Sequence, residues 1–164
     1  MNQECTGAGI IIFFDNRGIK QPIVEGLDKD VLYLFLNNLN NRYDFPKGSI
    51  DFGEFPLDCA IRETFEEINL NKDDYFFVNK EGKDFISEKK NKDNNNHVLR
   101  MYISELKRDK LSSPKININP HTKIKEHNDF YFLRRKEGED LLLDYLKKPM
   151  EWCDNIVLNF LDET

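Results

Sequence analysis

Short runs of β-branched and aromatic residues, separated by polar stretches, recur along the chain. Such runs are typical of buried or half-buried strands, because these side chains pack well on a pleated surface. They predict strands at residues 7–14, 31–36, 74–78, 83–87, 97–104 and 129–133.

The connections between these runs are polar. Residues 18–30 contain Pro22 and Gly26 and are expected to form a loop with a weak extended segment. Residues 37–56 have the Gly, Pro and Asn content of an irregular loop, and residues 88–96 are expected to form a solvated hairpin loop.

Two segments have a helical pattern. Residues 57–68 form the strongest predicted helix, and residues 138–161 predict one or two helices interrupted by Pro149. Strands, a helix, more strands and then helices together predict an α/β fold around a central mixed sheet. A chain of 164 residues has the length of one compact domain, so we expect a single domain over residues 1–164.

The predicted helix at 57–68 separates apolar from acidic positions. At about 100° per residue, its expected core side carries Leu57, Ala60, Ile61, Thr64, Phe65 and Ile68. Glu63, Glu66 and Glu67 share the other side as i, i+3 and i+4 neighbours. Like charges at this spacing destabilise a helix by about 0.2–0.5 kcal/mol per pair, so we expect a cation beside them.

Clustered carboxylates are hard oxygen ligands, which Mg²⁺ and Mn²⁺ prefer. The three glutamates therefore indicate a divalent-metal site. The alternative is a solvated face of a surface helix, which needs no ligand.

Composition and charge say less about the function than the acidic helix does. The net charge is −6 and the isoelectric point is near 5.2, which disfavours tight non-specific binding of nucleic acid over the whole surface. Cys5, Cys59 and Cys153 are far apart and lack zinc-ligand spacing, so we interpret them as reduced thiols. With no long apolar run and no signal-peptide pattern at the start, we expect a soluble, cytoplasmic protein that does not enter a membrane.

The acidic helix belongs to a longer motif. The pattern G-x5-E-x7-R-E-x-x-E-E is formed by Gly48, Glu54, Arg62, Glu63, Glu66 and Glu67. It resembles the Nudix box, the signature of the Nudix hydrolases. The box departs from the family pattern at Asn69, which stands where glycine is usual, and at Thr64, which stands at an aliphatic position. Neither change removes a carboxylate, and Asn tolerates the left-handed conformation of a helix end.

The resemblance implies a Nudix-type α/β/α sandwich with a catalytic loop-helix-loop. It implies that Glu63, Glu66 and Glu67, with the main-chain carbonyl of Gly48, hold Mg²⁺ or Mn²⁺. Glu54 and Arg62 would form an ion pair that orients these glutamates.

The resemblance also implies hydrolysis of a pyrophosphate bond in a nucleoside diphosphate linked to another group. Candidates for the base that activates water are Glu66, Glu67 and Glu126, the last in the loop before the strand at 129–133. The alternative for Glu126 is a solvated loop carboxylate.

The substrate is less defined. The segments at 45–48 and 58–63 are most similar to the mRNA-decapping type, so the 5′ cap of RNA is our first expectation, whereas PKG and the Glu-His pair at 126–127 also occur in diadenosine tetraphosphate hydrolases. Diphosphoinositol polyphosphates are a further alternative. RNA phosphates need a basic track, which could be supplied by Lys107, Arg108, Lys110, Lys115, Lys123 and Lys125, or by Lys89, Lys90 and Lys92.

Three residues before the box are candidates for substrate contacts. Lys47 stands beside Gly48, where it can meet a phosphate. Tyr43 and Phe45 can stack on a base, although packing in the core is the favoured alternative for both. A hypothesis of another class is a non-catalytic Nudix-fold binding module, but such a module is expected to have lost carboxylates or the arginine, and here all are present.

Overall fold

A computed structural model describes residues 4–17, 30–90 and 96–162. Its strands are β1 (Gly7–Asp15), β2 (Val31–Asn38), β3 (Tyr43–Asp44), β4 (Lys47–Ser49), β5 (Tyr75–Lys90), β6 (Asn96–Leu106) and β7 (His127–Leu133). Its helices are α1 (Pro56–Ile68), α2 (Arg135–Gly138) and α3 (Lys147–Asp162), with short 3-10 turns η1 (Arg108–Lys110) and η2 (Asp144–Leu146).

The strands form one mixed sheet in the order β3-β2-β1-β6-β5. β1 and β6 run parallel over Gly7–Phe13 and Leu99–Glu105, whereas the other pairs are antiparallel. Two strands lie off this path, β4 against β1 and β7 against β2. The expected α/β fold around a mixed sheet is therefore confirmed.

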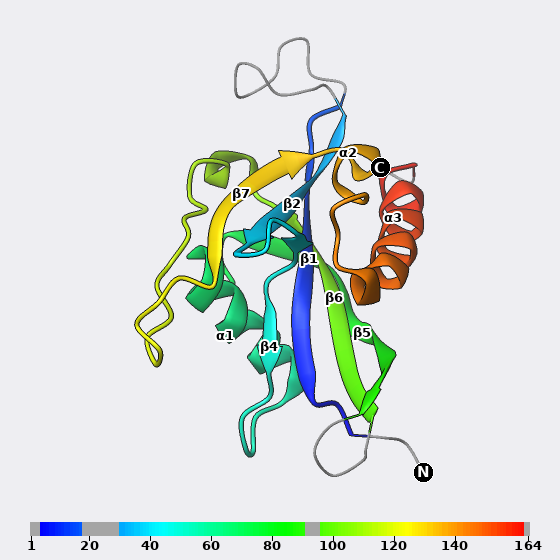
Figure 1. Cartoon of the computed structure of the whole chain (residues 1–164). Helices are drawn as coiled ribbons and strands as arrows, with labels where there is room; N and C mark the ends of the chain where they lie inside the picture. Colours follow the sequence, from blue (N-terminus) through cyan, green and yellow to red (C-terminus); the bar gives the residue numbers. More distant parts are fainter. Residues whose placement is uncertain (1–3, 18–29, 91–95, 163–164) are drawn as a thin grey trace.

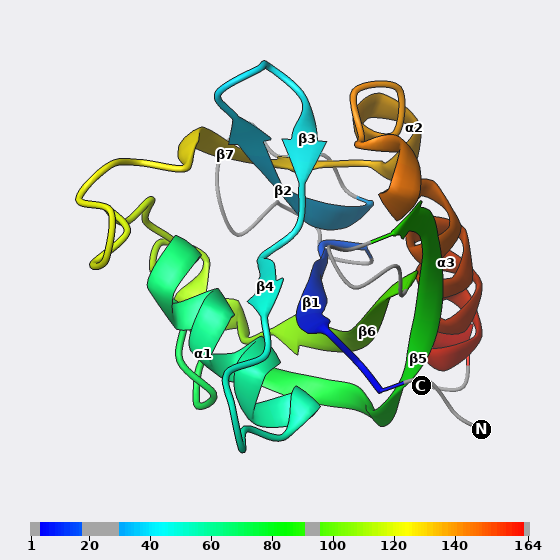
Figure 2. The same ribbon diagram turned by 60° about the horizontal axis from the view of Figure 1, so that its bottom comes forward.

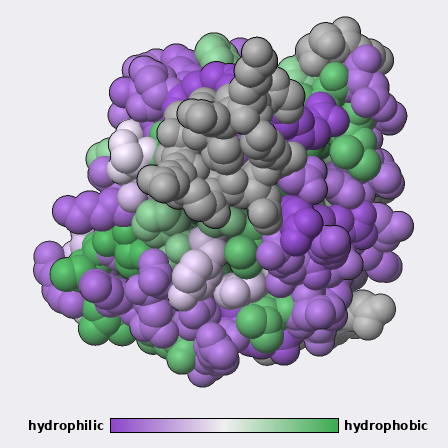
Figure 3. Space-filling view, turned by 90° about the horizontal axis from the view of Figure 1, so that it is seen from above, coloured by the Kyte–Doolittle hydropathy of each residue, from purple (hydrophilic) through white to green (hydrophobic). Residues whose placement is uncertain are grey.

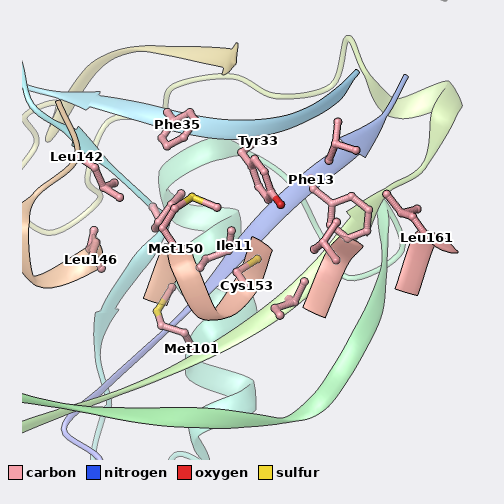
Figure 4. Close-up of a cluster of buried hydrophobic side chains, with 14 residues drawn as sticks. Ile11, Phe13, Tyr33, Phe35, Met101, Leu142, Leu146, Met150, Cys153 and Leu161 are labelled. Atoms are coloured by element: carbon pink, nitrogen blue, oxygen red, sulfur yellow. The ribbon is translucent and has the colours of Figure 1, made fainter. Parts of the chain in front are cut away.

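Helices cover both faces of the sheet. α1 lies on one face and α3 on the other, as Figures 1 and 2 show from two directions. Alternating side chains of the central strands supply two cores: Ile10 and Ile12 face α1, while Ile11 and Phe13 face α3. In the α3 core, the β1 and β2 side chains meet Met150 and other apolar residues of the C-terminal segment (Figure 4).

Most expected strands are present, with two differences. The runs at 74–78 and 83–87 belong to one strand, β5, which bends through register shifts instead of breaking. β5 continues into the expected hairpin loop as far as Lys90, and residues 91–95 lie outside the described part. Most of the expected loop at 18–30 also lies outside it.

Two loop and helix predictions need correction. The expected irregular loop at 37–56 contains the end of β2 and the short strands β3 and β4, because backbone pairing with β1 and β2 orders it. Pro149 does not interrupt a helix but lies in the first turn of α3. Main-chain N–H groups in the first turn have no acceptor within the helix, so the missing N–H of proline breaks no hydrogen bond there.

Helix α1 begins with Pro56 and ends at Asn69, which adopts the left-handed conformation with φ 64° and donates its N–H to the carbonyl of Phe65. The tolerance expected of Asn at this position is therefore confirmed. The expected division of the helix is wrong at two positions, since Phe65 is half exposed and Glu67 is buried. The cause is β4, which packs along the acidic side of α1 and turns that side inward.

Strand β4 lies very close to β1. A Cβ atom at Gly9 would overlap the carbonyl oxygen of Pro46 and the side chain of Lys47. Only glycine permits this approach, which places Lys47 and Gly48 beside α1.

In the view of Figure 3, hydrophilic residues predominate and hydrophobic ones form small groups among them. No helix within the described residues is both long and apolar enough to cross a membrane.

Candidate active site

Arg62 is the centre of the site's ion pairs. Its Nε and Nη2 atoms donate to the two carboxylate oxygens of Glu54 at 2.8 and 3.0 Å, a bidentate arrangement. Its Nη1 atom lies 3.0 Å from Glu63 Oε1 and 3.2 Å from Glu66 Oε2, and its Nη2 also donates to the carbonyl of Ser49. The structure therefore contains the expected Glu54–Arg62 pair, and the same guanidinium partly neutralises the glutamates.

Glu63 and Glu67 are carboxylates in a poorly solvated place. Burial raises the pKa of Glu63 to about 7; Arg62 opposes this shift, and Glu66 and Glu126 add to it. Burial also raises the pKa of Glu67 well above its ordinary value, against the attraction of Lys47. Both groups need a cation in order to remain charged.

Gly48 makes room for the carboxylate of Glu63. A Cβ atom at this glycine would overlap that carboxylate, so the backbone of β4 touches the acid directly. Cys59 lies fully buried below and donates its thiol hydrogen to the carbonyls of Gly48 and Ser49 at 3.5 and 3.4 Å. The Gly48 backbone therefore lies against the Glu63 carboxylate, while its carbonyl accepts from Cys59.

The acidic cluster, defined as Glu63, Glu66 and Glu67, lines a pocket together with Glu126. Glu126 precedes β7 and comes from a distant part of the chain. Asn119 holds it by donating from Nδ2 to Glu126 Oε1 at 2.9 Å. The remaining lining residues are Asn117, Asn119, Pro120 and His127. The structure thus brings together all the acidic residues that we considered as metal ligands or bases.

Lys47 is beside this cluster but does not extend freely towards solvent. Its ammonium lies 3.0 Å from Asp44 Oδ1 and 5.5 Å from the centre of the Tyr145 ring. Although burial disfavours its charge, Asp44, Tyr145 and Glu67 together raise the pKa of Lys47. Lys47 is therefore a stable cation at the edge of the site.

Two neighbouring residues, Asp44 and Tyr145, escaped the sequence reasoning, and a third, His127, entered it only as part of the Glu-His pair at 126–127. Asp44, His127 and Tyr145 surround Lys47 and Glu67 from β3, β7 and η2. Asp44 stands three residues before Lys47, so an i, i+3 ion pair was the available signal for it. Nothing in the local sequence placed Tyr145 there, since it is nearly 100 positions from Lys47.

The two aromatic candidates, Phe45 and Tyr43, differ in their exposure to solvent. Phe45 is fully buried and stacks on Phe35 with ring centres 5.5 Å apart, in agreement with the core alternative. Tyr43 is partly exposed, and its ring lies 5.9 Å from that of Tyr131, which is 38% exposed. Only the tyrosine is accessible to a base.

The donor set fits a hard divalent cation. It combines the carboxylate oxygens of the four pocket glutamates with burial that penalises uncompensated negative charge. In the described ranges, no three His, Cys, Asp or Glu side chains already converge as a metal site. The reason is visible in the contacts, because Arg62 draws Glu63 and Glu66 towards itself and the main-chain N–H of Lys47 contacts Glu67.

Comparison with known families shows to which family the chain belongs. The sequence model of the NUDIX domain matches residues 28–144, which include the whole motif and Glu126. The chain belongs to this family. The expected class of enzyme, a Nudix pyrophosphohydrolase, is confirmed with it. No curated protein matches the chain by sequence.

Solved structures share the Nudix fold at low sequence identity. A C. elegans Ap4A hydrolase in a binary complex superposes with a TM-score of 0.70 and 18% identity, covering 98% of this chain and 100% of its own. The Nudix hydrolase RenU from M. smegmatis gives 0.67 and 11%, covering 94% and 86%. The NUDIX domain of Shewanella oneidensis NrtR, complexed with ADP ribose, gives 0.63 and 11%, covering 96% and 90%.

Arg62→Ala is expected to lower the unfolding free energy of this Nudix domain by about 1.5–3 kcal/mol, because charged hydrogen bonds to Glu54 and the acidic cluster are lost. Mg²⁺ should also raise the melting temperature less than it does in wild type, since the glutamates lose their orienting partner. Arg100→Ala is the matched control, because Arg100 forms a bidentate pair with Asp84 away from the cluster. Equal Mg²⁺ shifts in the two variants would contradict an orienting role for Arg62.

The pH dependence of stability should report on Glu63. Its pKa in the metal-free folded protein is about 7, above the ordinary 4.5. Between these values the folded state retains a proton that the unfolded state releases, so stability is lost as pH rises. Urea unfolding in EDTA at about pH 5 and pH 8 should show a larger loss for wild type than for Glu63→Gln. The same loss in both proteins would assign the effect to other groups.

Proposed function

We propose that this Nudix domain is a divalent-metal-dependent hydrolase that cleaves a pyrophosphate bond in a dinucleoside polyphosphate. The observation that carries the proposal is the single pocket lined by the acidic cluster and Glu126. A metal-binding carboxylate group and a separate carboxylate that can accept a proton then face the same space. Pyrophosphate hydrolysis needs both functions, because the anionic substrate repels hydroxide.

The acidic cluster and the carbonyl of Gly48 are proposed to hold Mg²⁺ or Mn²⁺. The bound ion would neutralise charge on the phosphate oxygens and fix their orientation. Arg62 keeps Glu63 and Glu66 within reach through its contacts at 3.0 and 3.2 Å. These residues therefore prepare the charge distribution before the substrate arrives.

Glu126 is our proposed base. It accepts one hydrogen bond from Asn119 and is exposed at the pocket, so its second oxygen is accessible to a water molecule. Glu66 and Glu67 are the alternatives, but as metal ligands their lone pairs would be engaged. A water that loses a proton to Glu126 would attack phosphorus, and the phosphate on the other side of the anhydride would leave.

The proposed nucleotide contacts are Lys47, next to Glu67, and two tyrosines on β3 and β7. Lys47 places a cation next to Glu67, where it would meet a phosphate, and Tyr43 with Tyr131 offers a partly exposed aromatic surface for a base. The C. elegans Ap4A hydrolase, which matches over its full length, supports a dinucleoside polyphosphate as the first candidate. The complex of the NrtR domain supports a nucleoside diphosphate derivative more generally.

The RNA cap is the second candidate. The loop between η1 and β7 supplies Asn117, Asn119 and Glu126 to the pocket, and its exposed Lys115, Lys123 and Lys125 are available for RNA phosphates. Two other lysines of the expected track are engaged elsewhere: Lys107 lies over the Phe76 ring, and Lys110 is 3.8 Å from Asp74. The track is thus shorter than expected, which favours the smaller substrate.

Hydrolysis of diadenosine tetraphosphate with Mg²⁺ or Mn²⁺ is expected to exceed hydrolysis of cap-labelled RNA, ADP-ribose and a diphosphoinositol polyphosphate. Product chromatography measures each reaction. Glu67→Gln should lower kcat by at least about 100-fold, because it removes a charged ligand. Release of m7GDP with little dinucleotide cleavage would establish the cap instead. No turnover of any of the four substrates would favour a binding module.

Glu126→Gln is expected to lower kcat about 10²- to 10⁴-fold, because the amide cannot accept the proton of water. KM and Mn²⁺ affinity should change little, since Glu126 is not among the proposed ligands. Glu151→Gln, an exposed carboxylate on α3, serves as the control. If kcat of Glu126→Gln stayed within threefold of this control, the base would have to be Glu66 or Glu67.

A further inference from the structure

A further buried acid, Asp44, lies outside the acidic cluster and contacts Lys47. Asp44 is only 7% exposed, yet three residues supply hydrogen-bond donors to its carboxylate. Lys47 Nζ lies 3.0 Å from Oδ1, His127 Nε2 lies 3.2 Å from Oδ2, and the main-chain N–H of Phe45 donates to Oδ1 at 2.9 Å. A buried carboxylate with this many donors is a well-satisfied, immobile group.

The contacts of Asp44 continue to the site through the main chain. The N–H of Lys47 donates to Glu67 Oε2 at 3.3 Å. Only Phe45 and Pro46 separate Asp44 from Lys47 in the sequence. The ion pair between the Asp44 and Lys47 side chains therefore closes the turn between β3 and β4. Closing this turn fixes the direction of the Lys47 N–H.

Glu67 needs such support. It lies on the side of α1 covered by β4, and among the described residues Arg62 pairs with Glu63 and Glu66 rather than with Glu67. Its side chain accepts a hydrogen bond from the main-chain N–H of Lys47. The orientation of Glu67 therefore depends on the β3–β4 turn.

We propose that Asp44 is a positioning residue for the metal ligand Glu67, acting through Lys47. This proposal rests on the proposed function, in which Glu67 holds the divalent ion. Asp44 anchors the ammonium of Lys47, the anchored side chain fixes the turn, and the main-chain N–H of Lys47 then orients the Glu67 carboxylate. Asp44 also holds His127, which lines the same pocket, and so ties β7 to β3 beside the site.

Substitution of Asp44 by Asn tests this chain of contacts. The amide has nearly the same shape but no negative charge, and an NH2 donor replaces one of the two oxygens that now face Lys47 Nζ and His127 Nε2. The ammonium of Lys47 is then left buried without its counter-ion, which favours its movement towards solvent. The turn loosens and Glu67 loses its fixed donor.

The matched control is Asp74→Asn. Asp74 is 6% exposed, accepts the main-chain N–H of Asn71 at 2.9 Å and lies 3.8 Å from Lys110 Nζ, but it has no place in the pocket. The two variants make the same chemical change at equally buried acids. A loss of stability alone should therefore affect both proteins in the same way.

Mn²⁺ binding, followed by electron paramagnetic resonance of the free ion, is the decisive measurement. We expect the Kd for Mn²⁺ to rise about 10- to 100-fold in Asp44→Asn and to stay within about threefold of wild type in Asp74→Asn. The Mn²⁺ concentration for half-maximal hydrolysis should rise by the same factor. Unchanged or equal Mn²⁺ affinities in the two variants would overturn the proposal.

A double variant covers failure of the single one to fold. Asp44→Asn with Lys47→Met removes both buried charges and avoids the unpaired ammonium. It should still bind Mn²⁺ at least about tenfold more weakly than wild type, because the turn is no longer closed; wild-type affinity would again overturn the proposal. If wild type binds Mn²⁺ but hydrolyses none of the substrates, the proposed function fails, while the affinity comparison still decides the role of Asp44.

Discussion

The burial of carboxylates beside one another is the constraint on which the site depends. Glu63 and Glu67 lie where solvation is poor, and burial alone raises the pKa of each. Negative charge can persist there only if cations and N–H donors are fixed nearby. Arg62 supplies one such cation and Lys47 another, and the close packing of β4 on β1, which Gly9 permits, brings the second one into place.

Much of this arrangement follows from short-range sequence. The resemblance to the Nudix box implied the Glu54–Arg62 pair, and the left-handed turn at residue 69 agrees with the tolerance expected of Asn there, because both depend on neighbours within one helix and its preceding loop. The strands were predictable because β-branched and aromatic runs mark buried extended segments. The family followed from the motif, whereas the substrate did not, since related motifs occur with several nucleotide derivatives.

Other features depend on contacts between distant parts of the chain. A helical wheel could not show that Phe65 is exposed and Glu67 buried, because β4 decides which side of α1 is covered. The same holds for Asp44 and His127, which are 83 positions apart yet 3.2 Å from each other. Pro149 was misjudged for a simpler reason: its effect depends on where the helix starts, and that start is fixed by packing on the sheet.

Phe45 connects the core on the α3 side of the sheet with the residues that serve the α1 side. Its ring stacks on Phe35 in the core that α3 closes, while Asp44 before it and Lys47 after it serve the α1 side. Four consecutive residues thus span both sides of the protein. The core around the C-terminal helix therefore supports the backbone that carries Asp44 and Lys47, and a cavity opened beside Phe35 is expected to shift that backbone.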